Sequence, residues 1–318
     1  MIARRSLLLV TLTTPAFAQG WAPSRPIRLV VPFAAGGSAD ATARMLAEPM
    51  SAALGQPVIV ENRPGGGATL GANLVARAAP DGHTILYGTP GPQIINPHLM
   101  RSLPYDAERD FAPISGVKRA PNLLAVHPSL GVASVAELLA LARARPGVLT
   151  FASSGIGSSS HLAGEMLKFL GQVDITHVPY RGTGPAMTDL LAGTVSMALD
   201  TLSILLPPSR AGSLRALGVT TPRRSRLVPD LPALAETLPG FDAAPFNYLA
   251  APAGTPAPAI AWLNAVVVGI LNDPAYRARM EALGEEATPS TPEELAAVIA
   301  AESARWRRLI EAAGIRAE

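Results

Sequence analysis

The sequence predicts an α/β protein whose strands pair mostly in parallel. Short runs rich in β-branched and apolar residues alternate with segments of helical periodicity along the chain. The 318 residues can bury one large core or, more comfortably, two. Because 48% of the residues are hydrophobic, there are enough apolar side chains for a packed interior, which excludes a disordered or collagen-like protein.

A first β-α-β-α-β unit is expected near the N-terminus. Ile27–Val31 is an apolar strand that ends at Pro32, and a helix follows from Ser38, a residue suited to capping it, to about Leu54. Gly55 stands where this helix should end, since glycine readily adopts the left-handed conformation of a C-terminal cap. The unit continues with a strand at 58–60, a helix at 68–78 and a strand at 84–87.

A less regular stretch, 90–110, separates this unit from a second one of the same kind. Its expected strands are 122–126, 149–152, 176–178, 197–199 and 214–219. Its expected helices are 135–144, 161–170, 184–191 and 204–211. From about Pro256 onward the chain is expected to be mostly helical. No long linker interrupts the pattern, so two domains would be joined by ordinary short segments.

Several kinds of chemistry are excluded by composition. The chain has no cysteine, which removes disulfides, thiolate zinc sites, iron–sulfur clusters and cysteine nucleophiles. No two of its five histidines have the i, i+4 spacing of a zinc-protease helix. The GxSxG turn of common hydrolases does not occur. We therefore expect no metal and no cofactor.

Residues 1–18 are predicted to be a cleavable signal peptide. Arg4 and Arg5 precede an apolar run at 7–12, and Ala16-Phe17-Ala18 forms a small-x-small cleavage site. Export by the general secretory route is favoured over the twin-arginine route. Removing the leader lowers the 26 basic residues by two arginines, to match the 24 acidic ones. A neutral chain gives no sign of a nucleic-acid or anionic-membrane partner.

The rest of the chain is expected to be soluble and exported to the periplasm. Its longest apolar stretch, 259–271, contains Asn264 and lies between Pro258 and Pro274. This is shorter than the roughly 20 residues that a membrane-spanning helix needs.

A first candidate binding turn is the segment from Pro32 to Asp40. It joins the end of the first strand to the start of the first helix, where unpaired N–H groups and the helix dipole favour an anion. The alternative is a purely structural turn capped by Ser38. Asp40 would repel an anion unless it hydrogen-bonds the loop or meets an ammonium group.

A second candidate is the serine- and glycine-rich segment 153–160, again between a strand and a helix. Its glycines let the backbone approach a ligand, and its serines supply hydroxyl donors. It lacks the lysine of a P-loop and the third glycine of a dinucleotide-binding turn. The alternative is a flexible solvent loop. His161 is expected to be a hydrogen-bonded histidine at the start of the helix rather than a base.

A third candidate is the turn 178–184. Arg181 can pair bidentately with a carboxylate or can be an ordinary surface arginine. Asp200, at the end of a later strand, would bind a ligand amine or brace the neighbouring loops. The glycine-rich segment 62–67 carries no lysine of a phosphate-binding loop and is interpreted as a structural turn.

Taken together, seven segments in register resemble the Bug family, the periplasmic substrate-binding receptors of tripartite tricarboxylate transporters. They cover essentially the whole chain after the leader. The matching motifs lie at 26–40, 55–65, 80–82, 110–114, 155–162, 177–182 and 251–256.

The resemblance implies a two-domain "Venus flytrap" of the type II periplasmic binding-protein class, each domain a mostly parallel sheet flanked by helices. Residues 19–120 and 223–318 would form domain 1, and residues 121–222 would form domain 2. The ligand would be a small carboxylate: a dicarboxylate or tricarboxylate, an acidic amino acid or a related organic acid. It would lie between the domains and be delivered to integral membrane transporter subunits.

The resemblance also implies which residues bind the ligand. Domain 1 would contribute Phe33, Gly36, Gly37 and Asp40. Domain 2 would contribute Ser154, Gly155, Gly157, Ser158, Ser159, Arg181, Gly182, Thr183 and Asp200. Independently of the family, glycine-containing turns at helix starts suit an anion without a large net positive charge. The proline-rich loop 88–93 could narrow or re-aim the cleft.

Two other functions stay open beside a receptor that does no chemistry. A hydrolase would use Ser159 or Ser160 with a histidine and an aspartate, which requires a histidine within hydrogen-bond reach of one serine. A signalling adaptor would present its closed form to the outer domain of a membrane sensor kinase.

Overall fold

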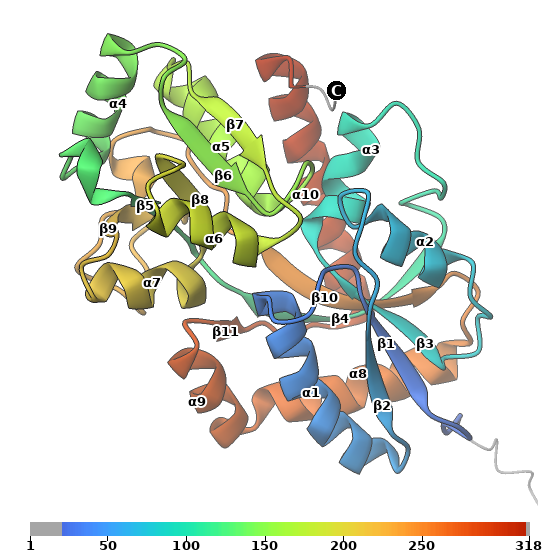
Figure 1. Cartoon of the computed structure of the whole chain (residues 1–318). Helices are drawn as coiled ribbons and strands as arrows, with labels where there is room; N and C mark the ends of the chain where they lie inside the picture. The colour runs from blue at the N-terminus through green and yellow to red at the C-terminus, as the bar shows by residue number, and fades with distance from the viewer. Residues whose placement is uncertain (1–20, 316–318) are drawn as a thin grey trace, which may run out of the picture.

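The computed structural model describes residues 21–315, and the predicted signal peptide at 1–18 lies outside them. Two β-sheets, each with its own set of helices, form two lobes (Figure 1). The α/β class with two sheets is therefore confirmed.

The first sheet has the strand order β11-β4-β10-β3-β1-β2. Its strands are β1 (Ile27–Val31), β2 (Val58–Asn62), β3 (Thr84–Gly88), β4 (Phe111–Arg119), β10 (Phe246–Pro252) and β11 (Glu286–Ala287). Its helices are α1 (Ser38–Leu54), α2 (Thr69–Ala76), the π-helical turn η1 (Gly91–Ile95), α3 (Asn96–Leu99), α8 (Ala257–Asn272), α9 (Pro274–Ala282) and α10 (Pro292–Ala313). Alternate residues of β1 pack against apolar side chains of α1 and α8, such as Leu46 and Leu263.

The second sheet has the order β7-β6-β8-β5-β9. Its strands are β5 (Asn122–Val126), β6 (Thr150–Ser153), β7 (Thr176–Pro179), β8 (Met197–Thr201) and β9 (Arg215–Val219). Its helices are α4 (Val135–Ala144), α5 (Ser159–Gly171), α6 (Thr183–Leu191) and α7 (Leu202–Arg210), with short 3-10 turns η2 (Pro128–Leu130) and η3 (Leu234–Glu236).

Pairing within both sheets is mixed, which corrects the expectation of mostly parallel sheets. Parallel pairs join β1 to β2 and β3, and β6 to β7 and β8. Antiparallel pairs join β10 to β3 and β4, β11 to β4, and β5 to β8 and β9. Strands β4 and β10 were not expected from the sequence. Both contain proline and their pairing has register shifts, so neither has a regular strand pattern.

Helices α5, α6 and α7 differ from the prediction by one or two residues at their ends, and α1 and α2 differ at their starts for identifiable reasons. The cap of α1 is Gly37, without a side-chain hydrogen bond, so Ser38 does not cap the helix and is its first residue. The Ser38 hydroxyl instead donates to Glu285. Helix α2 is shorter than 68–78, because Ala68 before it has a positive φ of 74°. The predicted stop of α1 is confirmed, since Gly55 has the left-handed φ of 65°.

The chain crosses between the sheets at two adjacent places. One follows β4, between Arg119 and Asn122, and the other precedes β10, where the Ala120 N–H donates to the Pro245 carbonyl oxygen at 3.3 Å. Residues after β9 still contact the second sheet, since the Val219 N–H donates to Pro232 and the Ala243 N–H to Thr220. The exact domain limits stay a prediction.

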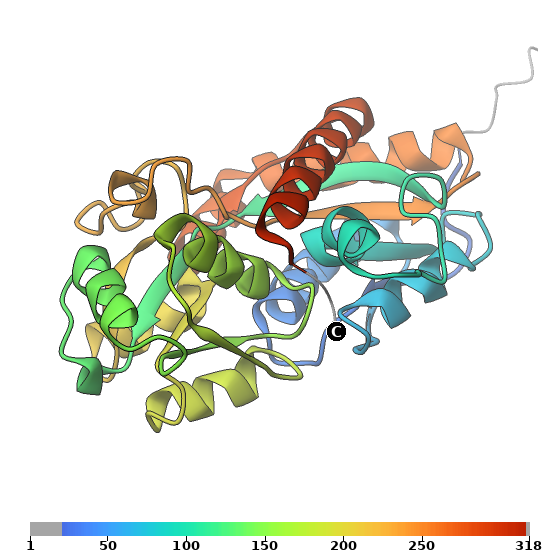
Figure 2. The same cartoon turned by 90° about the horizontal axis from the view of Figure 1, so that it is seen from above.

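Among residues 21–315, no single helix is long and apolar enough to cross a membrane. Helices α8 and α9 pass that test only as a pair, and they are bent by 70° relative to each other. Viewed from above, the C-terminal helix α10 lies between the helices of the two lobes, where it contacts α3, η1 and α5 (Figure 2).

Candidate functional site

A cavity of about 210 Å³ lies between the two lobes, where strand-to-helix turns from both sheets meet. One side of it is the turn 33–39, between β1 and α1. The other side is made by residues that follow β6 and β7 and by the last two residues of β8. Pro245, at the crossing before β10, and Asn247, the second residue of β10, line the cavity toward the connection between the lobes.

Ten of the thirteen predicted binding residues line this cavity. They are Phe33, Gly36, Gly37, Ser154, Ser158, Ser159, Arg181, Gly182, Thr183 and Asp200. Gly155 and Gly157 line a neighbouring cavity, and Asp40 lines neither.

Asp40 supports the first turn through hydrogen bonds and does not line the cavity. Its carboxylate accepts hydrogen bonds from the Gly36 N–H at 2.9 Å, from Arg44 Nε at 3.0 Å and from Asn62 Nδ2 at 3.0 Å. Burial alone would raise the pKa of Asp40, but Arg44, the Gly36 N–H and Asn62 together hold it below its ordinary value. An acid next to an anion site would repel the anion unless it hydrogen-bonded the loop or met an ammonium group. Asp40 meets the first of these conditions. The structure gives Asp40 a supporting position rather than a place in the wall.

Three helix N-termini lie at the cavity. Helices α1, α6 and α7 have no side-chain hydrogen bond at their caps. Residues at the start of each, Ser38, Thr183 and Thr201, line the cavity. The first N–H of α7, that of Leu202, already donates to the Pro121 carbonyl oxygen at 3.2 Å. The other first-turn N–H groups and the positive ends of the helix dipoles favour an anion there without requiring several cationic side chains.

Arg181 and Asp200 are the charged side chains of the wall. Arg181 is exposed and makes no hydrogen bond or ion pair with another described residue. Asp200 is 8% exposed and accepts hydrogen bonds from Thr183 Oγ1 at 3.1 Å and from the Thr201 N–H at 2.7 Å. Burial raises the pKa of Asp200 despite these donors. Asp200 therefore joins the starts of α6 and α7.

The serine-rich turn is held by internal hydrogen bonds and differs from an open solvent loop. The Ser160 hydroxyl accepts from the Ser154 N–H at 2.9 Å, and Ser158 caps α5 by accepting from the His161 N–H at 3.2 Å. Ser158, Ser160 and His161 are all buried. His161 also accepts from the Gly157 N–H at 3.3 Å, so it is the hydrogen-bonded helix-start histidine that the sequence predicted.

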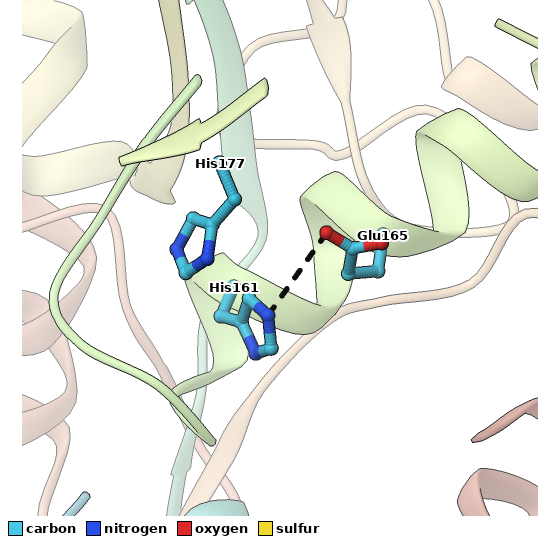
Figure 3. Close-up of side chains that lie close together, drawn as sticks. All are labelled: His161, Glu165 and His177. Carbon is cyan, nitrogen blue, oxygen red and sulfur yellow. Dashed lines mark ion pairs between the residues drawn. The ribbon is translucent and has the colours of Figure 1, made fainter. Parts of the chain in front are cut away.

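A cluster behind this turn was missed by sequence reasoning. His161 and Glu165 of α5 approach His177 of β7, with His161 Nε2 4.0 Å from Glu165 Oε1 (Figure 3). The two imidazole rings stack at 4.2 Å, and Phe151 stacks on the other side of His177. The i, i+4 spacing of His161 and Glu165 puts them on one face of α5, but no spacing in the sequence adds His177, which joins them because β7 pairs with β6.

This cluster fits packing better than metal binding. Imidazoles bound to one metal point their nitrogen lone pairs at a common centre, whereas these rings lie face to face. The Nδ1 atom of His161 is engaged by the Gly157 N–H, and Glu165 is paired with Lys168 at 3.0 Å. The donor set does not suit a metal ion in this arrangement.

The hydrolase alternative lacks the geometry it requires. The hydroxyl of Ser160 bonds Ser154 and Ser158, and no histidine pairs with Ser159 or Ser160 within residues 21–315. The serine next to this turn whose hydroxyl meets a histidine ring is Ser153, at 2.6 Å from His177 Nε2. Ser153 is only 1% exposed and does not line the cavity.

Six wall residues lie outside the three candidate turns and were not among the predicted binding residues: Thr89, Pro90, Pro185, Thr201, Pro245 and Asn247. The proline-rich loop after β3 gave a usable signal for Thr89 and Pro90. Pro245 and Asn247 could not be found, because β10 itself was not predicted.

Comparison with known proteins shows which family the chain belongs to. The sequence model of the tripartite tricarboxylate transporter family receptor, TctC, matches residues 42–315. The chain belongs to the TctC family. A relative from Pseudomonas sp. (strain P51), "UPF0065 protein in tcbD-tcbE intergenic region", is 38% identical over 312 residues, covering 98% of this chain and 93% of the relative. Protein BugT of Bordetella pertussis is 36% identical over 296 residues, covering 92% and 91%. The resemblance to the Bug receptors is thereby confirmed.

Solved structures of TctC relatives share the fold. Rpa4515 of R. palustris, solved with adipate, superposes with a TM-score of 0.89 at 38% identity, covering 92% of this chain and 99% of that one. The periplasmic binding protein BugD gives a TM-score of 0.87 at 35% identity, with coverage of 93% and 100%. MatC of Rhodopseudomonas palustris, with bound malate, gives 0.85 at 36%, with coverage of 91% and 99%. TctC proteins are periplasmic solute-binding proteins, and small acids are bound in two of these structures.

Proposed function

We propose that this protein captures a small carboxylate in the cleft between its lobes and delivers it to the membrane subunits of a tripartite tricarboxylate transporter. The observation that carries the proposal is the meeting of three helix N-termini without side-chain caps around one cavity. Adipate and malate in the relatives' structures support an acid as the ligand class. Residues 1–18 would direct export to the periplasm.

The wall residues divide into donors and supports. Arg181 is free to pair with a carboxylate, and the hydroxyls of Ser154 and Ser159 can donate to its oxygens. Asp200 would face a hydroxyl or ammonium group of the ligand, or share a proton with it, because a bare carboxylate next to another is unfavourable. Gly36 and Gly37 let the backbone N–H groups of the first turn approach the ligand.

Closure of the cleft would occur about the two adjacent crossings near Ala120 and Pro245. We take domain 1 as 19–120 with 223–318, and domain 2 as 121–222. The contacts of Pro232 and Ala243 with β9 and its end favour moving the second limit toward residue 244. No observation favours a sensor-kinase adaptor over transport.

The proposal is tested by a thermal-shift panel on chain that has been unfolded and refolded to remove carried-over ligand. The panel contains monocarboxylates, dicarboxylates, tricarboxylates, acidic amino acids and neutral amides. A ligand at 100 times its Kd stabilises the folded state by about 2.7 kcal/mol, which shifts the midpoint visibly. A response confined to acids is expected. A response to neutral amides alone would overturn the anion assignment.

A further inference from the structure

A second, larger cavity adjoins the cleft and has different walls. Its volume is about 740 Å³. It shares Phe33, Ala34, Ser154, Ser158 and Arg181 with the first cavity, so these residues form the boundary between the two.

The walls that belong only to the second cavity carry no charge. Their side chains are Pro32, Pro64, Ala68, Ile156, Pro179 and Tyr180, and the remaining positions are glycines. The one charged side chain that reaches this cavity is Arg181, at the boundary. The first cavity, in contrast, contains Asp200, Asn247 and the starts of α1 and α6.

The second cavity lies where the two lobes approach through backbone. A Cβ atom on Gly67 would lie 2.5 Å from the carbonyl oxygen of Ile156, and one on Gly91 would lie 3.0 Å from that of Gly157. Pro245 and Asn247, next to the crossings, line only the first cavity. The polar cavity is therefore the one at the connection between the lobes, and the apolar cavity lies on the far side of Phe33 and Arg181.

From this division we infer that the ligand is an elongated acid with one charged end and one apolar end. Its carboxylate would occupy the first cavity, and an alkyl or aryl end would occupy the second. Burying apolar surface away from water is favourable, whereas a second carboxylate placed among Pro64, Ile156 and Pro179, away from Arg181 at the boundary, would lose its hydration without a cationic partner. This inference rests on the proposed function and narrows its ligand class.

The decisive comparison is between hexanoate and adipate, which have the same chain length and differ in the far end. Binding of each to the refolded protein is measured by titration calorimetry, with butanoate as the short reference. We expect hexanoate to bind at least about tenfold more tightly than adipate, because its methyl end needs no partner. Hexanoate should also bind roughly tenfold more tightly than butanoate, as each buried methylene adds about 0.8 kcal/mol.

A pair of variants tests whether the gain in affinity with chain length comes from the second cavity. Ile156→Ala removes apolar surface from the second cavity, and the hexanoate-to-butanoate affinity ratio should fall severalfold. Val148→Ala makes a similar reduction at an exposed position outside both cavities and should leave this ratio unchanged.

The outcomes separate this inference from the proposed function. If adipate binds more tightly than hexanoate, the receptor function stands and an anion site at the Gly65–Gly67 turn replaces the apolar one. Equal affinities for hexanoate and butanoate would likewise overturn the inference alone. Failure of every acid to bind would overturn both.

Discussion

Ser153 and His177 connect two adjacent parallel strands, with the Ser153 hydroxyl 2.6 Å from Nε2 of His177. The same hydroxyl accepts the Gly155 N–H at 3.2 Å, at the start of the serine-rich turn. His177 stacks between Phe151 and His161, and His161 accepts the Gly157 N–H. Both glycine N–H groups of the turn are thus held by the side chains behind it.

Replacing Ser153 should therefore affect both stability and binding. Ser153→Ala leaves His177 Nε2 and the Gly155 N–H without this partner, and we expect the free energy of unfolding to fall by about 1–3 kcal/mol. Ligand affinity should fall as well, because the turn that carries Ser154 and Ser158 loses its support. Urea unfolding and titration calorimetry measure the two effects.

The chain offers a matched control for this variant. Ser129 bonds His127 Nδ1 at 2.8 Å in a pair of the same chemistry that is exposed and outside the cleft. Ser129→Ala should change stability little and binding not at all. Equal effects of the two substitutions would show that the Ser153–His177 pair has no special relation to the turn.

The buried imidazoles should make stability depend on pH in a specific window. Burial, with the neighbouring His177 and Lys168 charges, lowers the pKa of His161 to about 3, and burial with Lys168 lowers the pKa of His177 to about 4. The unfolded chain has an ordinary histidine pKa near 6.5, so between these values it binds more protons than the folded chain. Their contribution is complete above about pH 6.5, falls progressively below that pH, and is fully lost once the pH is below about 4 for His177 and about 3 for His161.

Urea unfolding at pH 7, 6 and 5 measures this loss before most carboxylates titrate. His161→Gln should flatten the dependence, since one of the two imidazoles is then absent. His127→Gln replaces a half-buried histidine outside this cluster and serves as the control. A slope that is the same in all three proteins would assign the pH dependence to other groups.

Lys118 and Glu285 form a buried ion pair that hydrogen-bonds the start of α1, directly after the first turn. They are each 2% exposed, and Lys118 Nζ also donates to Ser38 Oγ at 2.9 Å and Thr42 Oγ1 at 2.8 Å. Lys118→Met should cost about 3–5 kcal/mol of unfolding free energy, because Glu285 then stays buried without its partner.

The double variant Lys118→Met with Glu285→Leu should be more stable than Lys118→Met alone. Thermal or urea unfolding of the four proteins in this cycle gives the coupling energy between the two residues. Additive effects would mean that the pair does not act as a unit.

Asp200 should matter for binding through the loops it joins. Asp200→Ala removes the acceptor of the Thr183 hydroxyl and the Thr201 N–H, two donors at the starts of α6 and α7. We expect carboxylate affinity to fall by about 1 kcal/mol or more, measured by calorimetry. Asp200→Asn, which keeps one acceptor oxygen, should lose less. If the alanine variant bound an acid more tightly, Asp200 would act mainly by repulsion.

The sequence predicted the turns of the site better than its sheets. Strand–glycine–helix segments such as Val31 to Ser38 are formed by residues close together in the sequence. Glycine and serine in such a segment directly indicate a turn and the start of a helix. The strands β4 and β10 are defined by pairing partners far away in the chain, which no local pattern records. For that reason Asn247 was missed. The His161–His177 contact was missed for the same reason, since it depends on which strand lies next to β6.

Arg181 gives the most direct test of the anion site. It is the one cationic side chain in the wall of the first cavity, and no described residue neutralises it. Arg181→Ala should weaken binding of a carboxylate by about 1 kcal/mol or more, the size of a lost charged hydrogen bond. Arg181→Lys should recover only part of the affinity, because an ammonium cannot form the two parallel bonds of a guanidinium. Arg145→Ala removes the same charge outside both cavities and should leave affinity unchanged. Unchanged affinity in Arg181→Ala would leave the helix N-termini as the main holders of the acid, and binding would then show little dependence on ionic strength.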